Sequence, residues 1–357
     1  MIVATDVPLK DWCTLKVGGP ARWFREARTE SDAIEALRWA EARGLPVLVL
    51  GGGSNVVIAD EGFHGLVLKV AIDGISALDL GGKVRFAVGS GEEWDPFVAR
   101  TVSENCAGLE CLSGIPGLVG GTPVQNVGAY GQDVSATIRS VRVIDRDAQR
   151  VVTMANADCG FGYRTSRFKH ADAGRFIVTG VEFVLARGGQ PTITYADVVK
   201  YFEALQQAPT LCAVRDAILE IRSRKGMVIK EGNPANRSCG SFFVNPVISR
   251  THFTRIGEAP HYPAGEDHVK VPAAWLIEQA GFKKGHIAGP VGISPFQAQG
   301  LINRGGATAA DVVGLAVDIK RAVWDRFAIA LVPEPVFVGF NNDSTVRWLL
   351  DPSPERA

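Results

Sequence analysis

Residues 112–131 read Leu-Ser-Gly-Ile-Pro-Gly-Leu-Val-Gly-Gly-Thr-Pro-Val-Gln-Asn-Val-Gly-Ala-Tyr-Gly, and six of these twenty residues are glycine. Because each glycine weakens a helix or a strand, neither element tolerates that density. Backbone without side chains can instead approach a ligand closely and direct several N–H groups at it. Thr122, Gln125 and Asn126 add side-chain donors and acceptors to the same stretch.

The apolar residues among these glycines decide between two interpretations of the stretch. A glycine-rich segment is more often a surface loop than a binding loop. Here Ile115, Leu118, Val119, Val124 and Val127 lie between the glycines, and a solvated linker would not carry them. We therefore expect a buried loop that cradles a ligand.

A second glycine cluster, Gly51-Gly52-Gly53-Ser54-Asn55, follows an apolar run at 47–50 that is expected to form a buried strand. A Rossmann phosphate loop would open a helix at this point. Val56-Val57-Ile58 comes instead, and its β-branched residues prefer a strand. The backbone donors of the cluster can still bind a pyrophosphate without a helix. Taken alone, the cluster is equally compatible with a tight hairpin.

Composition favours a small-molecule partner. The chain has 357 residues, enough for two or three domains. Lys+Arg and Asp+Glu balance at 38 each, so no bulk field attracts nucleic acid or an anionic membrane. No apolar run reaches the roughly 20 residues of a membrane span, and the N-terminus lacks the pattern of a secretory signal. We expect a cytoplasmic protein with reduced thiols.

Neither the cysteines nor the histidines indicate a metal site. The chain has six of each. The cysteines form no CxxC pair, and the histidines are scattered without ligand spacing. No metal is predicted.

Hydrophobic periodicity, capping signals and β-branched runs predict a mixed α and β chain. Helices are expected at 29–44, 90–102 (with Ser90 and Glu93 as a capping box), 211–221, 272–280 and 308–327. Strands are expected at 47–50, 56–58, within 65–90, and at 138–145, 150–154, 176–185, 192–195, 241–246 and 329–339, the last of them interrupted by Pro-Glu-Pro.

Single residues leave the chemistry open. Ser241 has no evident His and Asp partners, and an isolated strand serine usually bonds to backbone. Arg164 follows an aromatic residue in a glycine-rich turn, where an ordinary surface arginine is about as good an interpretation. Glu334 stands between two prolines and apolar neighbours, so it is expected to be partly buried and to need a cation or donor. The basic residues at 222–225 either complement a helix C-terminus or bind phosphate.

Five segments in order carry more information than any of them alone: GGGSN at 51–55, SGIPGLVGGTPVQNVGAYGQ at 113–132, CGFGYRTSRFK at 159–169, CGSFFVNP at 239–246 and LVPEP at 331–335. Together they resemble the UDP-N-acetylenolpyruvoylglucosamine reductase family. The resemblance extends from Trp12 to Gly339, nearly the whole chain.

The resemblance implies an α+β protein with the FAD-binding fold of the vanillyl-alcohol oxidase type in two subdomains, plus a separate α+β substrate-binding domain. Residues 1–68 would form the first FAD-binding subdomain, with the C-terminal tail 330–357 packing back on it. Residues 69–226 would form the second, and residues 227–329 the substrate-binding domain. A monomer is expected.

The resemblance also implies the reaction and its residues. NADPH would reduce a non-covalent FAD, which would then reduce the enolpyruvyl ether of UDP-N-acetylglucosamine to UDP-N-acetylmuramate for peptidoglycan. The FAD contacts would be Gly51, Gly52, Gly53, Ser54, Asn55, Gly114, Ile115, Pro116, Gly117, Gly120, Gly121, Thr122, Gln125, Asn126, Gly128 and Ala129. The catalytic residues would be Ser241, Arg164 and Glu334, and the substrate contacts Tyr163, Tyr195, Lys225, Asn245 and Gln297.

The implied roles are chemically coherent. Adding hydride to an enolpyruvyl ether leaves carbanion character that is delocalised into the substrate carboxylate, and Arg164 would stabilise that charge. Glu334 would orient or polarise the same region, and Ser241 would deliver the proton to carbon. Tyr195 would belong to a lid over the UDP-sugar that one subclass of the family has. One position departs from the family pattern Gly-Ser-Phe-Phe-Lys-Asn-Pro, because Val244 replaces the lysine.

Two alternatives remain open at this stage. A flavin-dependent oxidase of small alcohols or sugars would share the fold, but such enzymes often tether flavin to a histidine near the glycine turn, where this chain has Ser54 and Asn55. A non-catalytic flavin-binding protein would keep both glycine segments without needing Ser241, Arg164 and Glu334 together.

Overall fold

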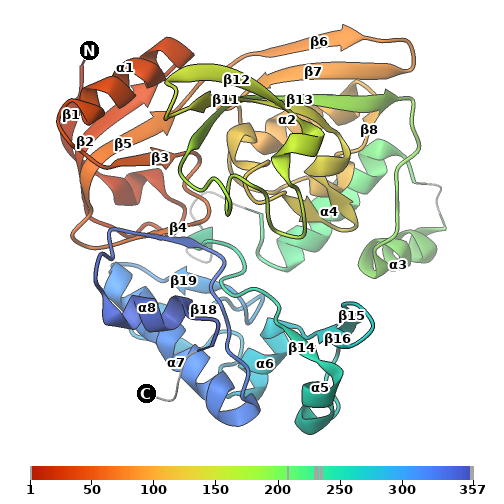
Figure 1. Ribbon diagram of the computed structural model, residues 1–357. Helices are drawn as coiled ribbons and strands as arrows, with labels where there is room; N and C mark the ends of the chain where they lie inside the picture. The colour runs from red at the N-terminus through yellow and green to blue at the C-terminus, as the bar shows by residue number, and fades with distance from the viewer. Residues whose placement is uncertain (1, 207–208, 229–232, 234–235, 354–357) are drawn as a thin grey trace. The chain divides into compact units, whose positions relative to one another are not determined.

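The computed structural model describes residues 2–206, 209–228, 233 and 236–353 (Figure 1). The chain divides into two compact units, each made of three segments. Unit 1 comprises Met1–Asp6, Arg22–Gly52 and His64–Val228, and unit 2 comprises Val7–Ala21, Gly53–Phe63 and Ile229–Ala357. Each unit has its own hydrophobic core.

The first sheet has the strand order β1-β2-β5-β3 and lies mostly in unit 1. Strand β3 runs parallel to β5, with Val47 opposite Leu66. Helix α1 covers the sheet through small residues, which include Ala33 and Ala40. The elements are β1 (Ala4–Pro8), β2 (Pro20–Ala27), α1 (Glu30–Glu41), β3 (Val47–Leu50) and β5 (Phe63–Val70).

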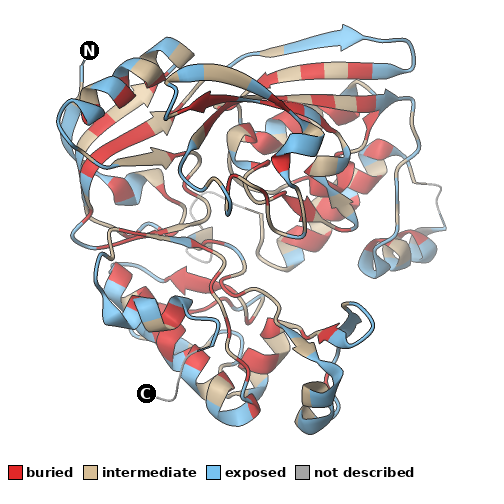
Figure 2. Ribbon diagram, in the orientation of Figure 1, coloured by how far each residue is buried: buried red, intermediate tan, exposed pale blue. Residues whose placement is uncertain are grey.

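The second sheet of unit 1 has six strands in the order β12-β11-β13-β7-β6, with β8 also paired to β13. Its strands are antiparallel, and β7 alternates between buried and less buried residues (Figure 2). Trp94 and Phe97 of α2 pack on Phe183 of this sheet. The elements are β6 (Ile75–Asp79), β7 (Lys83–Gly89), α2 (Trp94–Ser103), β8 (Cys106–Ala107), β11 (Ile138–Asp145), β12 (Arg150–Ala155) and β13 (Phe176–Arg187).

The remainder of unit 1 consists of short elements and two helices. Helices α3 (Ala196–Leu205) and α4 (Leu211–Arg224) pack together through an apolar cluster that includes Val198 and Ile218. The short elements are η2 (Glu110–Leu112), η3 (Val119–Gly121), β9 (Gly128–Ala129), β10 (Gln132–Asp133), η4 (Val134–Ala136) and η5 (Asn156–Cys159).

Unit 2 is built around α7 (Ala309–Phe327), whose buried face joins the largest core cluster of this unit (Figure 2). Two three-stranded sheets, β14-β16-β15 and β17-β18-β19, and the parallel pair β4 and β20 belong to it. Apart from α7, the elements of unit 2 are η1 (Leu9–Trp12), β4 (Val56–Ile58), β14 (Val247–Ser249), α5 (Arg250–Ile256), β15 (Tyr262–Pro263), β16 (His268–Lys270), α6 (Ala273–Gln279), β17 (Ile287–Ala288), β18 (Val291–Ile293), β19 (Leu301–Asn303), β20 (Val336–Val338) and α8 (Ser344–Leu350).

Most of the predicted elements are confirmed. The mixed α and β content and the helices expected at 29–44, 211–221, 272–280 and 308–327 are present. Thr29 caps α1 through a reciprocal capping box with Asp32, and Thr308 does the same for α7 with Asp311. The strands at 47–50, 56–58, 138–145, 150–154 and 176–185 are also present, although only Leu50 of β3 is fully buried.

The prediction of a capping box at Ser90 is wrong. Helix α2 begins at Trp94 with Glu93 as its N-cap, and no side chain caps it. The backbone of Ser90 is used elsewhere, because its N–H donates to Thr179 and its carbonyl oxygen accepts from Gly120. Both backbone groups of Ser90 therefore have partners outside α2.

Three predicted strands are wrong or shorter than expected. Residues 192–195 form no strand, and Tyr195 is the N-cap of α3. Residues 241–246 contain only an isolated bridge at Phe243, and a strand begins after Pro246 instead. The strand at 329–339 is interrupted at Pro-Glu-Pro, as predicted, and its regular part is shorter than the predicted range, because only β20 forms. The hairpin interpretation of 51–55 is also wrong, since β3 pairs with β5 and β4 with β20.

Candidate active site

The glycine-rich loop 112–131 of unit 1 is buried, as predicted, and is bound to the start of α2. Val119 and Val127 lie in the core. The N–H of Gly114 donates to a carboxylate oxygen of Asp95 over 2.6 Å. Arg215 of α4 holds both oxygens of that carboxylate, at 2.6 and 2.8 Å. The first turn of the loop is thereby fixed between two helices.

The glycines of segments 51–55 and 112–131 differ in the space around them. Glycines with open space beside the backbone are the ones that a ligand could approach. A Cβ on Gly52 would lie 2.8 Å from the Cα of Gly117, and one on Gly120 would lie 2.6 Å from the Cβ of Ser90, so protein packing requires these glycines. A Cβ on Gly51 or Gly121 would meet no described atom within 4 Å, and neither residue has a left-handed backbone. Open backbone of this kind suits the close approach of a dinucleotide.

Two predicted cofactor residues already use their side chains within unit 1. The Thr122 hydroxyl donates to the carbonyl oxygen of Val119 over 2.8 Å. Asn126 accepts from the N–H of Ser135 and donates to the carbonyl oxygen of Gly162 over 2.9 Å. Asn126 therefore ties the glycine-rich loop to the turn that carries Arg164.

Arg164 lies at the tip of a tight turn between the bridged residues Gly162 and Thr165. Its backbone is left-handed, with φ +54°, which is uncommon for a residue other than glycine. Its guanidinium lies 5.8 Å from the ring centroid of Tyr163, which is exposed. No carboxylate within the described parts of the chain forms an ion pair with Arg164. The turn thus presents a cation that can meet an anionic ligand.

Tyr195 and Lys225 meet around a residue that was not predicted, Tyr130. The rings of Tyr130 and Tyr195 are edge to face with centroids 5.3 Å apart. The Lys225 ammonium lies 5.9 Å from the Tyr130 ring and 2.8 Å from a carboxylate oxygen of Asp197. Tyr130 is the one aromatic residue in the stretch 112–131, and that signal could have identified it.

The three basic residues at 222–225 differ in their burial and in their partners. Arg222 is buried and donates to the carbonyl oxygen of Met227, and burial lowers its pKa. Arg224 is paired with Glu220 on its own helix. Lys225 is half-buried at the C-cap of α4, where it faces Tyr130.

In unit 2, backbone pairing brings Ser241 and Glu334 close together. The N–H of Glu334 donates to the carbonyl oxygen of Phe242 over 2.9 Å, and Phe243 forms an antiparallel bridge with Pro333. Both Ser241 and Glu334 are half-buried. Asn55 joins them, since its side chain donates to the carbonyl oxygen of Glu334 over 3.4 Å. A predicted cofactor residue and two predicted catalytic residues therefore share one locality.

The two predicted substrate residues of unit 2, Asn245 and Gln297, differ in their neighbours. The Asn245 side-chain oxygen accepts from the N–H of Ala273 over 2.9 Å and from the amide of Gln299 over 3.2 Å. Gln299, which was not predicted, also donates to Phe243 and accepts from the N–H of Phe242. Gln299 thus supports the segment of Ser241, whereas Gln297 is half-buried near Gly300.

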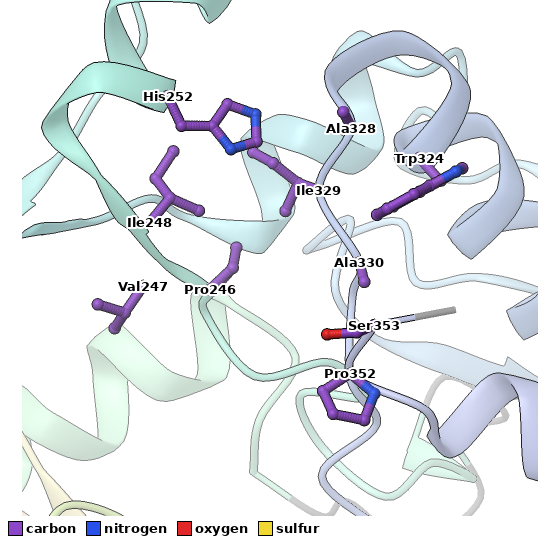
Figure 3. A pocket seen from close by; sticks show the side chains of 10 residues that line it. All are labelled: Pro246, Val247, Ile248, His252, Trp324, Ala328, Ile329, Ala330, Pro352 and Ser353. Carbon is purple, nitrogen blue, oxygen red and sulfur yellow. The ribbon is translucent and has the colours of Figure 1, made fainter. Parts of the chain in front are cut away.

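A separate pocket of about 300 Å³ in unit 2 contains none of the predicted site residues (Figure 3). Most of its lining residues are apolar in type, and His252 on its wall is bonded to the carbonyl oxygen of Phe327 over 2.8 Å. Its lining residues are Pro246, Val247, Ile248, His252, Trp324, Ala328, Ile329, Ala330, Pro352 and Ser353.

Two features are absent from the described residues. None of the helices located in the structure combines the length and the apolar character needed to cross a membrane. Within the same residues, His, Cys, Asp and Glu side chains form no group of three or more that could hold a metal ion.

Comparisons with known proteins define the class. Residues 21–154 match the model of an FAD binding domain, and residues 233–338 match the UDP-N-acetylenolpyruvoylglucosamine reductase C-terminal domain. The chain is therefore an FAD-containing oxidoreductase with a separate C-terminal domain, and the predicted fold class is confirmed.

Relatives narrow the class to one family. The UDP-N-acetylenolpyruvoylglucosamine reductase of Thermobifida fusca is 47% identical over 94% of this chain and 98% of its own. That of Streptomyces coelicolor is 44% identical over 94% and 90%. The crystal structure of the Thermus caldophilus reductase covers 94% of this chain and 98% of its own, at a TM-score of 0.63 and 25% identity. The chain belongs to the UDP-N-acetylenolpyruvoylglucosamine reductase family.

Proposed function

We propose that Ser241, Arg164 and Glu334 carry out the family reaction in this chain, the NADPH-dependent reduction of the enolpyruvyl ether of UDP-N-acetylglucosamine to UDP-N-acetylmuramate. The observation that carries this assignment is the pairing of Phe242 with Glu334, which holds Ser241 and Glu334 in one locality of unit 2. The reaction belongs to peptidoglycan precursor synthesis, and through it to cell shape and division.

The proposed roles follow from the chemistry of each side chain. When bound, FAD supplies the hydride for one alkene carbon. The Arg164 guanidinium binds the substrate carboxylate and stabilises the charge that develops there. The Ser241 hydroxyl donates the proton to the other alkene carbon, and the Glu334 carboxyl group orients that end of the substrate.

The substrate contacts that we propose are Lys225 for the diphosphate, Tyr163 and Tyr195 for ring contacts, and Asn245 and Gln297 for polar groups. Tyr195 supports membership of the subclass with a tyrosine-bearing lid, because it precedes a helix and is 41% exposed. A tyrosine in that position offers a ring for contact area and a hydroxyl for a phosphate.

FAD would be held without a covalent bond by the two glycine segments. Open backbone at Gly51 and Gly121 supports this proposal. The proposed contacts are Gly51–Asn55, Gly114–Gly117, Gly120–Thr122, Gln125, Asn126, Gly128 and Ala129. Thr122 and Asn126 would act through their backbone, since their side chains have protein partners.

The organisation of the chain completes the proposal. Residues 1–68 and 69–226 would be the FAD-binding subdomains, and 227–329 the substrate-binding domain. The pairing of β20 with β4 supports a tail that returns to the first of these segments. We further propose that the protein acts as a cytoplasmic monomer with NADPH and the UDP-sugar as its partners.

The assignment is tested by product analysis. Purified enzyme with NADPH and the enolpyruvyl ether should yield a UDP-sugar heavier by two hydrogens, in mass spectrometry, and one equivalent of NADP⁺. Ser241→Ala should slow the formation of that product by at least roughly 10²–10⁴-fold. Formation of hydrogen peroxide from a sugar or alcohol instead would favour the oxidase alternative, and the absence of any turnover would favour a non-catalytic flavin protein.

A further inference from the structure

The ion pair between Lys225 and Asp197 links the two helices that flank Tyr130 and Tyr195. Asp197 is the second residue of α3, and Lys225 is the C-cap of α4. Their charged atoms lie 2.8 Å apart. Figure 1 shows both helices in unit 1, and their apolar faces pack through Val198 and Ile218. The helix packing therefore holds the two charges in reach of each other.

This ion pair is accessible and therefore weak. The side chains of Lys225 and Asp197 are 39% and 45% exposed. Exposed pairs of this kind contribute about 1 kcal/mol or less. A ligand that offers a stronger anion to the same ammonium can displace the carboxylate at small cost.

Lys225 has few other partners that could replace Asp197. Its ammonium lies over the Tyr130 ring at 5.9 Å, a contact that leaves the donors available. Although burial lowers the pKa of Lys225, the hydrogen bond to Asp197 raises it overall, so the group stays charged. A half-buried ammonium beside two tyrosines is then ready to receive a phosphate once Asp197 leaves.

We propose that Asp197 is a counter-ion that occupies Lys225 until the diphosphate of the substrate displaces it, and that it thereby moderates the affinity for that diphosphate. The inference rests on the proposed role of Lys225 as the cation for the substrate diphosphate. A nucleotide with a diphosphate overcomes the pair, whereas a ligand without phosphate gains nothing from Lys225. Asp197 thus sets how much affinity a diphosphate gains from Lys225.

Binding of two probes to the FAD-loaded enzyme, UDP and uridine, tests the proposal by isothermal titration. Asp197→Asn should tighten UDP binding by about two- to fivefold, the worth of an exposed ion pair, and leave uridine unchanged. Glu203→Gln removes one charge from an exposed position of the same helix and is the matched control. It should change neither affinity. If circular dichroism shows that the Asp197→Asn variant has lost α3, Asp197→Ser removes the same charge and replaces it as the test variant.

A double-mutant cycle separates a direct pair from a general charge effect. Lys225→Gln should weaken UDP binding by roughly tenfold or more, since it removes a bond to a charged phosphate. In that background, Asp197→Asn should have no further effect. The inference about Asp197 is overturned if Asp197→Asn still tightens UDP binding in the Lys225→Gln background. It is also overturned if the Asp197→Asn variant binds UDP no better than wild type. Either result leaves the role of Lys225 intact. Unchanged UDP binding by Lys225→Gln would overturn both the role of Lys225 in binding the diphosphate and the role of Asp197 as its counter-ion. Product analysis would still test the proposed reaction independently.

Discussion

The backbone N–H of Glu334 donates to the carbonyl oxygen of Phe242 over 2.9 Å, which joins segments that are 92 positions apart in sequence. One residue before Phe242 is Ser241, so the two predicted catalytic residues of unit 2 share one backbone ladder. Gln299 supports this ladder from the other side through Phe242 and Phe243. Backbone geometry therefore positions the two residues that we propose as proton donor and orienting carboxyl group.

Ser241→Ala should separate the two half-reactions. The hydroxyl is proposed to act only in proton delivery, so NADPH should still bleach the flavin at a near-normal rate. Reoxidation by the enolpyruvyl ether should slow by at least the roughly 10²–10⁴-fold that general acid groups contribute. Stopped-flow absorbance measures both steps. An equal loss in both would assign Ser241 to the structure or to the flavin site.

Tyr195→Phe should raise the KM for the UDP-substrate by roughly tenfold, the worth of one hydrogen bond to a charged phosphate. The tyrosine stands at the N-cap of α3 and touches Tyr130 edge to face, so the ring contact survives in the variant. NADPH oxidation by the flavin and the melting temperature should change little. If the main effect is instead on thermal stability, Tyr195 belongs to the core and the lid proposal fails.

Gly121→Ala should weaken FAD binding while leaving the apoprotein as stable as wild type. A Cβ at Gly121 meets no described atom within 4 Å, so only a ligand close to the backbone would oppose it. Fluorescence titration of the apoprotein with FAD gives the affinity, and thermal unfolding gives the stability. Gly314→Ala in α7 is the control, because its Cβ also meets nothing within 4 Å and it should gain about 0.5–1 kcal/mol of stability without affecting FAD. Equal FAD affinity in both variants would remove Gly121 from the cofactor site.

The contribution of Lys320 to stability should rise at alkaline pH. Its ammonium is fully buried in unit 2 and donates to the carbonyl oxygens of Trp348, Leu349 and Asp351. Burial lowers its pKa from 10.5 to about 8. Between these values the unfolded chain binds the additional proton, so the free energy of unfolding rises with pH and that gain is lost as the pH falls through 8.

The corresponding measurement is urea unfolding of wild type and Lys320→Met from pH 7 to 10. The difference between the two should change by about 1–3 kcal/mol across this range, in favour of wild type at high pH. A difference that does not vary with pH would show that Lys320 keeps its ordinary pKa.

Sequence reasoning predicted the regular elements well because their signals are local. The capping of α1 by Thr29 with Asp32 and the apolar face of α7 depend on neighbours within a few residues. It failed where a distant segment competes for the same backbone groups. Gly120 takes the carbonyl oxygen of Ser90, and Phe243 pairs with Pro333 instead of extending a strand.

The candidate site shows the same division. The buried glycine-rich loop was predictable from composition, because apolar residues among glycines are incompatible with a solvated linker. Tyr130 and Gln299 were missed, since their importance depends on which residues the fold brings beside them. The pairing of Lys225 with Asp197 likewise requires two helices to pack.

The absorption spectrum of the flavin under anaerobic conditions tests the central claim most directly. NADPH should bleach the purified, yellow enzyme. The enolpyruvyl ether of UDP-N-acetylglucosamine, added without oxygen, should then restore the colour while UDP-N-acetylmuramate appears in equal amount. A flavin that stays bleached with this substrate and recovers only on admission of oxygen would contradict the account.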